Sequence, residues 1–318
     1  MKKSFFHGTY YREYREELKE NKTDLTYLFR SVDYAKRDGF QGIEVLPIFE
    51  FMKGDGTEFA DDYLDVAKRF REKMDKEGIK ASCFSFGVSV LNDPDYARRV
   101  MKKSADVAAI VGSPYLHHTF QCSLSHNNIR PENTFYQGAE KTFVEFGREI
   151  AEYAGEKGLE CIYEDQGYYV NTVERLGSLI AAIDMPNTGV CLDVGNSFFY
   201  DVLPESFAGA FASIIKHVHI KDYIKNDSAI KPGNGWDRTI SGSWLRNCVP
   251  GTGIVNFEKI FSILLEAGYD GFFSLENQNA LDNISNAAAI KEIGVAMNNI
   301  ERIYNKVLKT VGNSRMGV

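Results

Sequence analysis

Short apolar segments alternate with longer amphipathic segments about eight times along the chain. The short segments are rich in β-branched and aromatic residues, which is typical of strands buried on both faces of a parallel sheet. The pattern predicts eight strands: Ser4–Tyr10, Gly42–Pro47, Lys80–Phe86, Pro114–Phe120, Leu159–Glu164, Thr188–Asp193, His217–Asp222 and Gly271–Glu276.

The longer segments are predicted to be helices with one apolar face. One is expected to begin near Thr23 and to end at Gly39, and Asn256 is a candidate N-cap for another. Regular alternation of strand and helix predicts a (β/α)₈ barrel that spans residues 1–318 as a single domain. No GxGxxG motif follows the first strand, which argues against a dinucleotide-binding sheet.

The segment Lys225 to Pro250 is long, polar and rich in Gly, Asn and Arg. Long structureless loops in compact domains are usually functional. We therefore expect residues 225–250 to form an active-site loop after the seventh strand.

Charge and cysteine content narrow the class of protein. The 318 residues include 37 Lys and Arg against 44 Asp and Glu, a net charge of −7, which argues against broad binding to nucleic acid or anionic membranes. The five cysteines form no CxxC pair, and no apolar leader or membrane-spanning run is present. A cytoplasmic protein with reduced thiols is expected.

The candidate chemistry lies at the ends of four consecutive predicted strands, the fifth to the eighth. These strands deliver Glu164, Asp193, His219 and Glu276 to one rim of the barrel, where catalytic groups converge in this fold. Carboxylates buried this close together would repel one another unless a cation neutralised them. Three carboxylates and one imidazole suit Mn²⁺, Mg²⁺, Co²⁺ or Zn²⁺, so we predict one catalytic divalent ion.

Two histidines compete for the imidazole position on the seventh strand. His217 and His219 share a face because side chains alternate along a strand. His219 lies nearer the mouth and is the predicted ligand, while His217 is expected to pack or to hydrogen-bond below it.

Several segments resemble the xylose isomerase-like TIM barrels, a family that includes sugar isomerases, ketose 3-epimerases, inosose dehydratase and endonuclease IV. The segments that carry the resemblance are Gly42–Leu46, Tyr163–Gln166, Cys191–Asn196, Lys216–Asp222, Val249–Gly253 and Gly268–Asn277.

The resemblance implies that Glu164, Asp193, His219 and Glu276 bind one divalent ion, often Mn²⁺. It also implies that the two glutamates are the acid/base pair of a sugar isomerase or epimerase that removes a proton beside a carbonyl. Asn196 stands where ketose 3-epimerases carry a substrate-binding histidine, and Lys225 where they carry an arginine. The segment Val249–Gly253 is more similar to inosose dehydratase-type members.

Other polar residues near the rim are candidate substrate contacts. The predicted set is His7, Glu44, His118, Asn196, Lys221 and Arg246. For each, the alternative is an internal hydrogen bond or a solvated charge.

Four functional alternatives follow. The leading one is a metal-dependent isomerase or epimerase of a small carbohydrate, and the nearest rival is a lyase of the same site that dehydrates a keto-cyclitol or cleaves a 3-keto-glycoside. A catalytically silent sugar-binding barrel is more remote. A DNA repair enzyme is disfavoured by six histidines in all and the negative net charge. The resemblance also leads us to expect a homo-oligomer.

Overall fold

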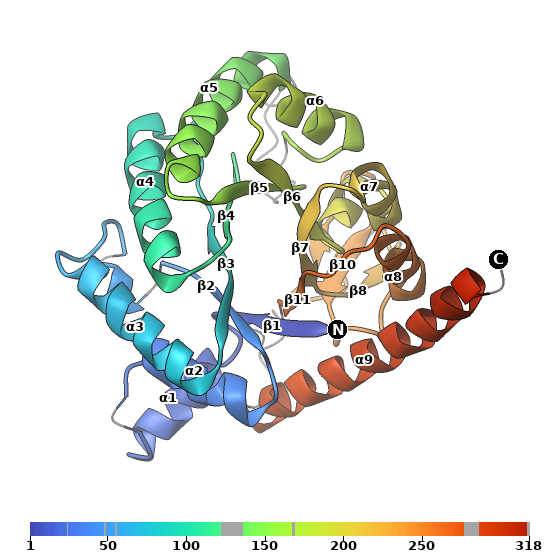
Figure 1. Cartoon of the computed structure of the whole chain (residues 1–318). Helices are drawn as coiled ribbons and strands as arrows, with labels where there is room; N and C mark the ends of the chain where they lie inside the picture. Colours follow the sequence, from blue (N-terminus) through green and yellow to red (C-terminus); the bar gives the residue numbers. More distant parts are fainter. Residues whose placement is uncertain are drawn as a thin grey trace.

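The computed structural model describes residues 1–23, 25–47, 49–54, 56–121, 136–166, 169–276 and 286–316. Within these ranges, eight parallel strands close into a barrel in the order β1-β11-β7-β6-β5-β4-β3-β2, and helices surround them (Figure 1). The barrel strands are β1 (Lys2–Phe6), β2 (Gly42–Val45), β3 (Lys80–Phe86), β4 (Tyr115–His118), β5 (Glu160–Glu164), β6 (Thr188–Asp193), β7 (Ile215–Ile220) and β11 (Phe272–Leu275). The predicted (β/α)₈ barrel is confirmed.

The helices of the described chain bury apolar residues, with the exception of α1. They are α1 (Tyr11–Lys19), α2 (Tyr27–Arg37), α3 (Tyr63–Glu77), α4 (Pro94–Val111), α5 (Tyr136–Gly155), α6 (Val173–Ile183), α7 (Pro204–Phe211), α8 (Phe257–Glu266) and α9 (Asn286–Met316). Within the described residues, 3₁₀ turns at Phe49–Phe51 and Asn196–Tyr200 lie between β2 and α3 and between β6 and α7. The side chain of Asn256 accepts a hydrogen bond from the backbone of Lys259 at 3.1 Å, so the predicted N-cap of α8 is confirmed.

The first connection differs from the prediction. The strand ends at Phe6 rather than Tyr10, because the chain turns there with Thr9 N–H bonded to the Phe6 carbonyl. Helix α1 follows, and the next helix begins at Tyr27, not near Thr23. Helix α1 was not predicted: its sequence is mostly charged, and none of its residues is fully buried.

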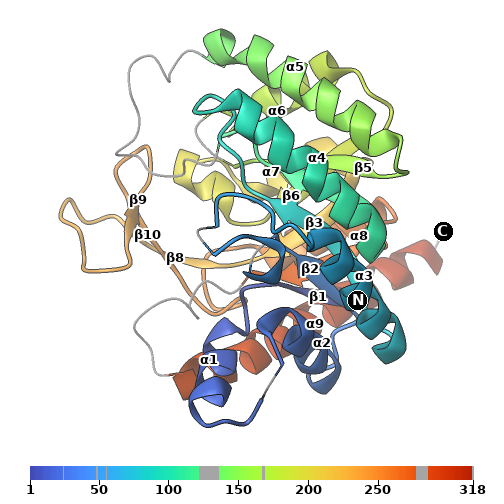
Figure 2. The same cartoon turned by 90° about the vertical axis from the view of Figure 1, so that its left-hand side faces the viewer.

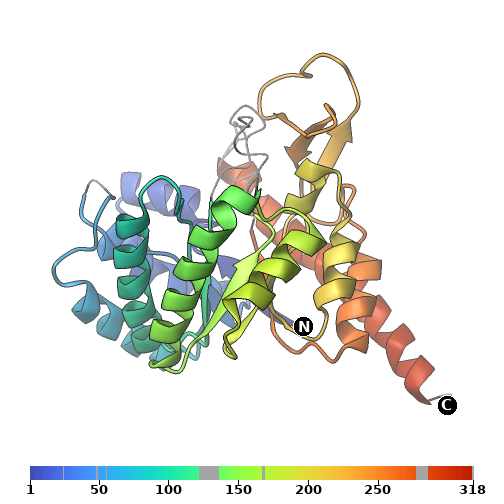
Figure 3. The same cartoon turned by 90° about the horizontal axis from the view of Figure 1, so that it is seen from above.

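The segment 225–250 is not structureless. Strands β8 (Tyr223–Asn226), β9 (Asp237–Arg238) and β10 (Trp244–Asn247) form a small antiparallel sheet in the order β8-β10-β9. This sheet projects beyond the ring of helices, at the end of the barrel opposite to the start of β1 (Figures 2 and 3). The segment therefore has its own framework at the carboxyl ends of the strands.

No helix in the described part of the chain is both long enough and apolar enough to cross a membrane. Asn277, the last residue of one segment quoted for the family resemblance, lies outside the described residues.

Candidate active site

The four predicted ligands meet at the carboxyl ends of neighbouring strands. Glu164 and Asp193 end β5 and β6, His219 is the penultimate residue of β7, and Glu276 directly follows β11. Each offers one ligand atom, and these four atoms all lie within 4.8 Å of one another. Nδ1 of His219 faces all three carboxylates, at 3.1 Å from Glu164 Oε1 and at 3.6 Å from both Asp193 Oδ2 and Glu276 Oε2.

Backbone and amide groups hold two of the carboxylates in place. Oδ1 of Asp193 accepts hydrogen bonds from the backbone N–H groups of Gly195 and Asn196, each at 2.8 Å. The side chain of Asn196 donates to Glu164 Oε1 at 2.9 Å. The tight turn after β6 therefore fixes one oxygen of each carboxylate, and Asn196 lies within the group.

Lys221 supplies a positive charge to the same group. Its Nζ lies 2.7 Å from Asp193 Oδ2 and 2.8 Å from Glu276 Oε2, and the side chain is 2% exposed. An ammonium buried this deeply needs paired charges, which the two carboxylates provide.

Glu44 lies beneath His219 inside the barrel and joins two histidines. Its carboxylate is 2.8 Å from Nε2 of His219 and 2.9 Å from Nε2 of His217, and Ser85 donates its hydroxyl to it. With Nε2 of His219 bonded to a carboxylate below, Nδ1 is left for the carboxylates above. The structure thus engages Glu44 with histidines, where a substrate contact was predicted, and His217 forms the hydrogen bond expected of it.

The pKa values of Glu164 and Glu276 are shifted in opposite directions. Burial would raise the pKa of Glu164, but His117 and His219 outweigh it and hold that pKa well below its ordinary value. Burial raises the pKa of Glu276 above its ordinary value, although Lys221 opposes the rise. Such a split is typical of a pair of carboxyl groups with different roles in proton transfer.

Two predicted substrate contacts, His7 and His118, face the helices and not the four predicted metal ligands. The ring of His7 stacks on Tyr27 of α2 at 5.2 Å, and the ring of His118 lies 5.3 Å from that of Phe146 of α5. Burial lowers the pKa of each histidine to about 3, so both are neutral at pH 7. The structure does not bring them to the carboxylates: His118 points outward at the end of β4, and His7 lies in the turn directly after β1.

The neighbouring residue His117 takes the inward position on β4. Its Nε2 lies 3.3 Å from Glu164 Oε2, and its ring centroid is 5.4 Å from that of His219. Of the two adjacent histidines, only His118 was a predicted substrate contact. The inward position of His117 follows from the register between β4 and β5, which pairs it with Ile162, two residues before Glu164, and this register is known only from the structure.

Arg246 stands on β10 and is exposed. Its guanidinium carbon lies 5.2 Å from the ring centroid of Trp236, a cation–π contact. The structure therefore places Arg246 in the small projecting sheet and not among the buried carboxylates.

Asp222, directly after Lys221, anchors the loop that follows β10. Its carboxylate accepts hydrogen bonds from the backbone N–H groups of Tyr223, Gly251, Gly253 and Val255, at 2.8 to 3.0 Å. A Cβ on Gly253 would lie 2.4 Å from an Asp222 oxygen, so glycine is required there. Asp222 had no predicted role, since backbone contacts leave no pattern in the sequence.

We expect Asp222→Ala to lower the free energy of unfolding by about 3 kcal/mol, because it leaves several backbone donors without their charged acceptor. Urea unfolding followed by circular dichroism measures the change. Asp61→Ala is the matched control, since the Asp61 side chain is 95% exposed. Equal unfolding midpoints for the two variants would contradict the anchoring role.

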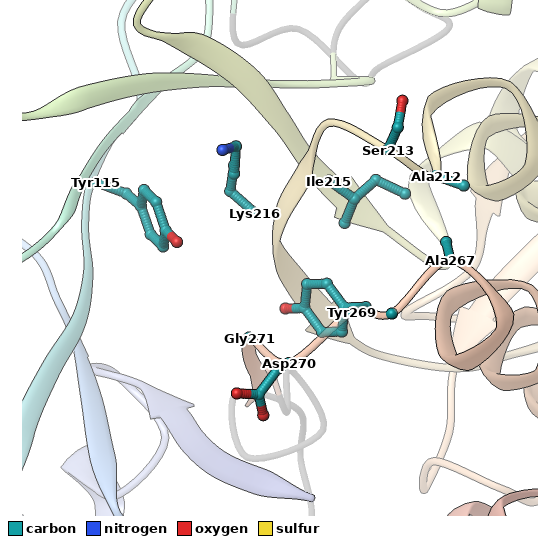
Figure 4. Close-up of a pocket in the computed structure, with 10 residues that line it drawn as sticks. Tyr115, Ala212, Ser213, Ile215, Lys216, Ala267, Tyr269, Asp270 and Gly271 are labelled. Atoms are coloured by element: carbon teal, nitrogen blue, oxygen red, sulfur yellow. The ribbon is translucent and has the colours of Figure 1, made fainter. Parts of the chain in front are cut away.

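A pocket of about 260 Å³ lies at the opposite end of the barrel (Figure 4). Tyr115, Lys216, Tyr269 and Asp270 line it, at or just before the amino ends of their strands. Its charged groups are already paired, Lys216 with Glu160 at 2.8 Å and Asp270 with Lys2 at 2.7 Å. The cluster of Glu164, Asp193, His219 and Glu276 lies at the carboxyl ends of the barrel strands. It is therefore the candidate site, as is usual for this fold.

Comparisons with known proteins agree with this fold. The chain is 24% identical to an inosose dehydratase of Bacillus licheniformis over 249 residues, which is 77% of this chain and 78% of that protein. The crystal structure of IOLI protein with a bound zinc atom superposes with a TM-score of 0.67 at 18% identity, covering 96% of this chain and 99% of that one. D-psicose 3-epimerase from Clostridium cellulolyticum H10 gives a TM-score of 0.66 at 15% identity, with the same coverage. The family model described as xylose isomerase-like TIM barrel matches residues 32–296, and the chain belongs to that family.

Proposed function

We propose that Glu164, Asp193, His219 and Glu276 hold one divalent metal ion, Mn²⁺ first among Mn²⁺, Mg²⁺, Co²⁺ and Zn²⁺. The observation that carries the proposal is the meeting of three carboxylates with Nδ1 of His219, while a fourth carboxylate, Glu44, holds the opposite nitrogen of that ring. This donor set of oxygens and one imidazole fits a hard or borderline divalent ion. The structure of IOLI protein has the same fold and contains a bound zinc atom, which supports a metal site in this barrel.

The proposed reaction begins with removal of a proton from a carbon beside a carbonyl. The bound ion would supply Lewis acidity toward substrate oxygens. Glu276 takes the proton, because its side chain is 11% exposed, against 3% for Glu164 and 0% for Asp193, and is the carboxylate of the three that a substrate reaches most easily. Glu164, at the end of β5 and separated from β11 by β6 and β7, completes the acid/base pair. Asn196 and Lys221 bind substrate oxygens beside them, and Arg246 remains a predicted contact from the small sheet.

The substrate class we propose is a keto-sugar or keto-cyclitol, and two outcomes share this first step. Return of a proton by the second glutamate gives an isomer or epimer, which the separation of Glu164 from Glu276 supports. Loss of a hydroxyl gives a dehydration, which the similarity to an inosose dehydratase supports.

Proton NMR in D₂O tests the proposal on a panel of ketoses, keto-cyclitols and 3-keto-glycosides with Mn²⁺-loaded protein. Metal-dependent deuterium at the carbon beside the carbonyl is the expected result. A new isomer, or loss of water or of an aglycone, then names the outcome. Exchange with no compound, with or without metal, would count against proton abstraction.

Glu44→Gln is expected to weaken divalent metal binding by about 10- to 100-fold, because the ring of His219 loses the carboxylate that orients it. Competition against a fluorescent chelator measures the dissociation constant. Ser85→Ala is a graded control, since it removes one donor to Glu44 and leaves both histidine contacts in place. An unchanged dissociation constant in Glu44→Gln would show that the ring needs no such support.

A further inference from the structure

A second group of potential metal ligands lies deeper in the barrel than the candidate site. Glu44 on β2, Cys83 on β3 and His217 on β7 each offer one ligand atom, and these three atoms lie within 4.8 Å of one another. All three side chains are fully buried. The interior of such a barrel is ordinarily packed with branched apolar side chains. A carboxylate, a thiol and an imidazole gathered there need a specific partner.

Strand register and barrel closure bring these three residues together. Cys83 is the register partner of Glu44 on the neighbouring strand. His217 stands on β7, which β1 and β11 separate from β2, and its Nε2 lies 2.9 Å from Oε2 of Glu44. The other oxygen of Glu44, Oε1, lies 2.8 Å from Nε2 of His219. Oε2 can therefore bind an ion while Oε1 still orients His219.

Hydrogen bonds leave this group incompletely satisfied. Nδ1 of His217 is buried and has no hydrogen-bond partner among the described residues. The contacts of the Cys83 thiol are long, at 3.7 Å to the carbonyl of Phe84 and at 3.5 Å to the hydroxyl of Ser85. That hydroxyl also contacts Glu44. Sulfur, nitrogen and two oxygens are thus within reach of one centre, and zinc sites in proteins have four ligands of these elements.

The charges of the group match one zinc ion. Metal binding removes the proton of a thiol, so Cys83 would contribute one negative charge and Glu44 another. Histidine binds a metal as the neutral ring, and two negative charges balance Zn²⁺. A site without net charge avoids most of the cost of burying an ion. A thiolate also favours Zn²⁺ over Mn²⁺ and Mg²⁺.

We propose that Glu44, Cys83 and His217 bind a second, structural zinc ion inside the barrel, with the hydroxyl of Ser85 as the fourth group. The ligands are fully buried, so this ion stabilises the barrel and does not meet a substrate. The inference goes beyond the proposed function and does not depend on it, because it needs neither a substrate nor an ion at the candidate site.

Cobalt in place of zinc makes the sulfur ligand visible. Co²⁺ bound to a thiolate absorbs in the near ultraviolet by charge transfer from sulfur, whereas the four residues of the candidate site offer no sulfur. The full chain is produced in zinc-depleted medium with Co²⁺, so that the ion is available while the barrel closes. We expect the charge-transfer band and, by elemental analysis, one metal ion per chain beyond any ion at the candidate site. A chain without the band would overturn the proposal.

Three cysteine variants identify the sulfur. Cys83→Ser is expected to lose the band and one metal ion per chain. Cys161→Ser is the matched control and should keep both, since Cys161 is also fully buried on a barrel strand and belongs to none of the ligand groups found in the described residues. Sγ of Cys191 lies 3.4 Å from Nε2 of His219. A band that survives Cys83→Ser but disappears in Cys191→Ser would overturn the proposal.

Two further variants separate the zinc site from the candidate site. His217→Gln removes the imidazole but keeps both cysteines, and it should also lose the band, which tests the site independently if Cys83→Ser does not fold. Circular dichroism verifies the fold of each variant. Asp193→Asn alters the candidate site alone and should leave the band at full strength. Loss of the band in Asp193→Asn, or its persistence in folded His217→Gln, would overturn the proposal. The band without cobalt at the candidate site would instead count against the proposed function alone.

Discussion

Removal of the metal ion with EDTA is expected to abolish proton exchange beside the substrate carbonyl, and Mn²⁺ is expected to restore it. Without the ion, the negative charge that develops on the carbonyl oxygen loses several kcal/mol of stabilisation, which corresponds to a rate loss of about 1,000-fold or more. Deuterium incorporation followed by NMR measures the effect, and elemental analysis verifies the metal content. Full exchange by the metal-free protein would contradict the proposed role of the site.

The same experiment has a second readout that does not need a substrate. A ligand that binds the native state alone stabilises it by about 2.7 kcal/mol at 100 times its dissociation constant. Mn²⁺ should therefore raise the melting temperature of the metal-free protein. Asp193→Asn should reduce that shift, because Oδ2 of Asp193 is one of the atoms that face Nδ1 of His219.

Glu276→Gln is expected to lower the exchange rate by about 100- to 10,000-fold, the usual contribution of a general acid or base. The amide keeps the size of the side chain and one oxygen, but it does not take up a proton. NMR in D₂O measures the rate, and equilibrium dialysis shows how much metal the variant retains. Reduced exchange at equal metal content would separate the loss of the base from the loss of a ligand.

Glu258→Gln is the matched control for this substitution. Glu258 lies on α8 with 53% of its side chain exposed, and its partner is Lys306 at 2.6 Å. An exposed ion pair of this kind contributes little, so both stability and exchange should stay unchanged. If the two variants behaved alike, Glu276 would have no part in proton transfer.

The barrel could be predicted because a buried parallel strand has a strong local signature. Strands β3 and β6 have the predicted bounds, and the other six differ from prediction by a few residues at one or both ends. Helix α1 was not predicted, because its sequence is mostly charged and offers few apolar side chains to bury. The small sheet was not predicted, because a strand as short as β9, which has two residues, shows almost no alternation of apolar and polar residues.

The convergence of Glu164, Asp193, His219 and Glu276 could be predicted for a topological reason. Parallel strands end at one rim, and residues at those ends are neighbours whenever the strands are neighbours. In the barrel order β11-β7-β6-β5, the four residues stand on or directly after adjacent strands, and Asp193 and His219 are direct register partners. Knowing the order and ends of the strands was enough.

The linear pattern of the chain therefore specifies the eight strands, the helices that cover them and the residue types at the rim. It did not specify which of His117 and His118 turns inward, because alternation relates residues of one strand to each other and not to the barrel axis. Nor did it place Glu44 under His219, since this contact joins strands far apart in sequence and follows a register shift at Ile43 and Glu44. Contacts of this kind arise when the barrel closes, because closure and register bring together side chains that no local periodicity relates.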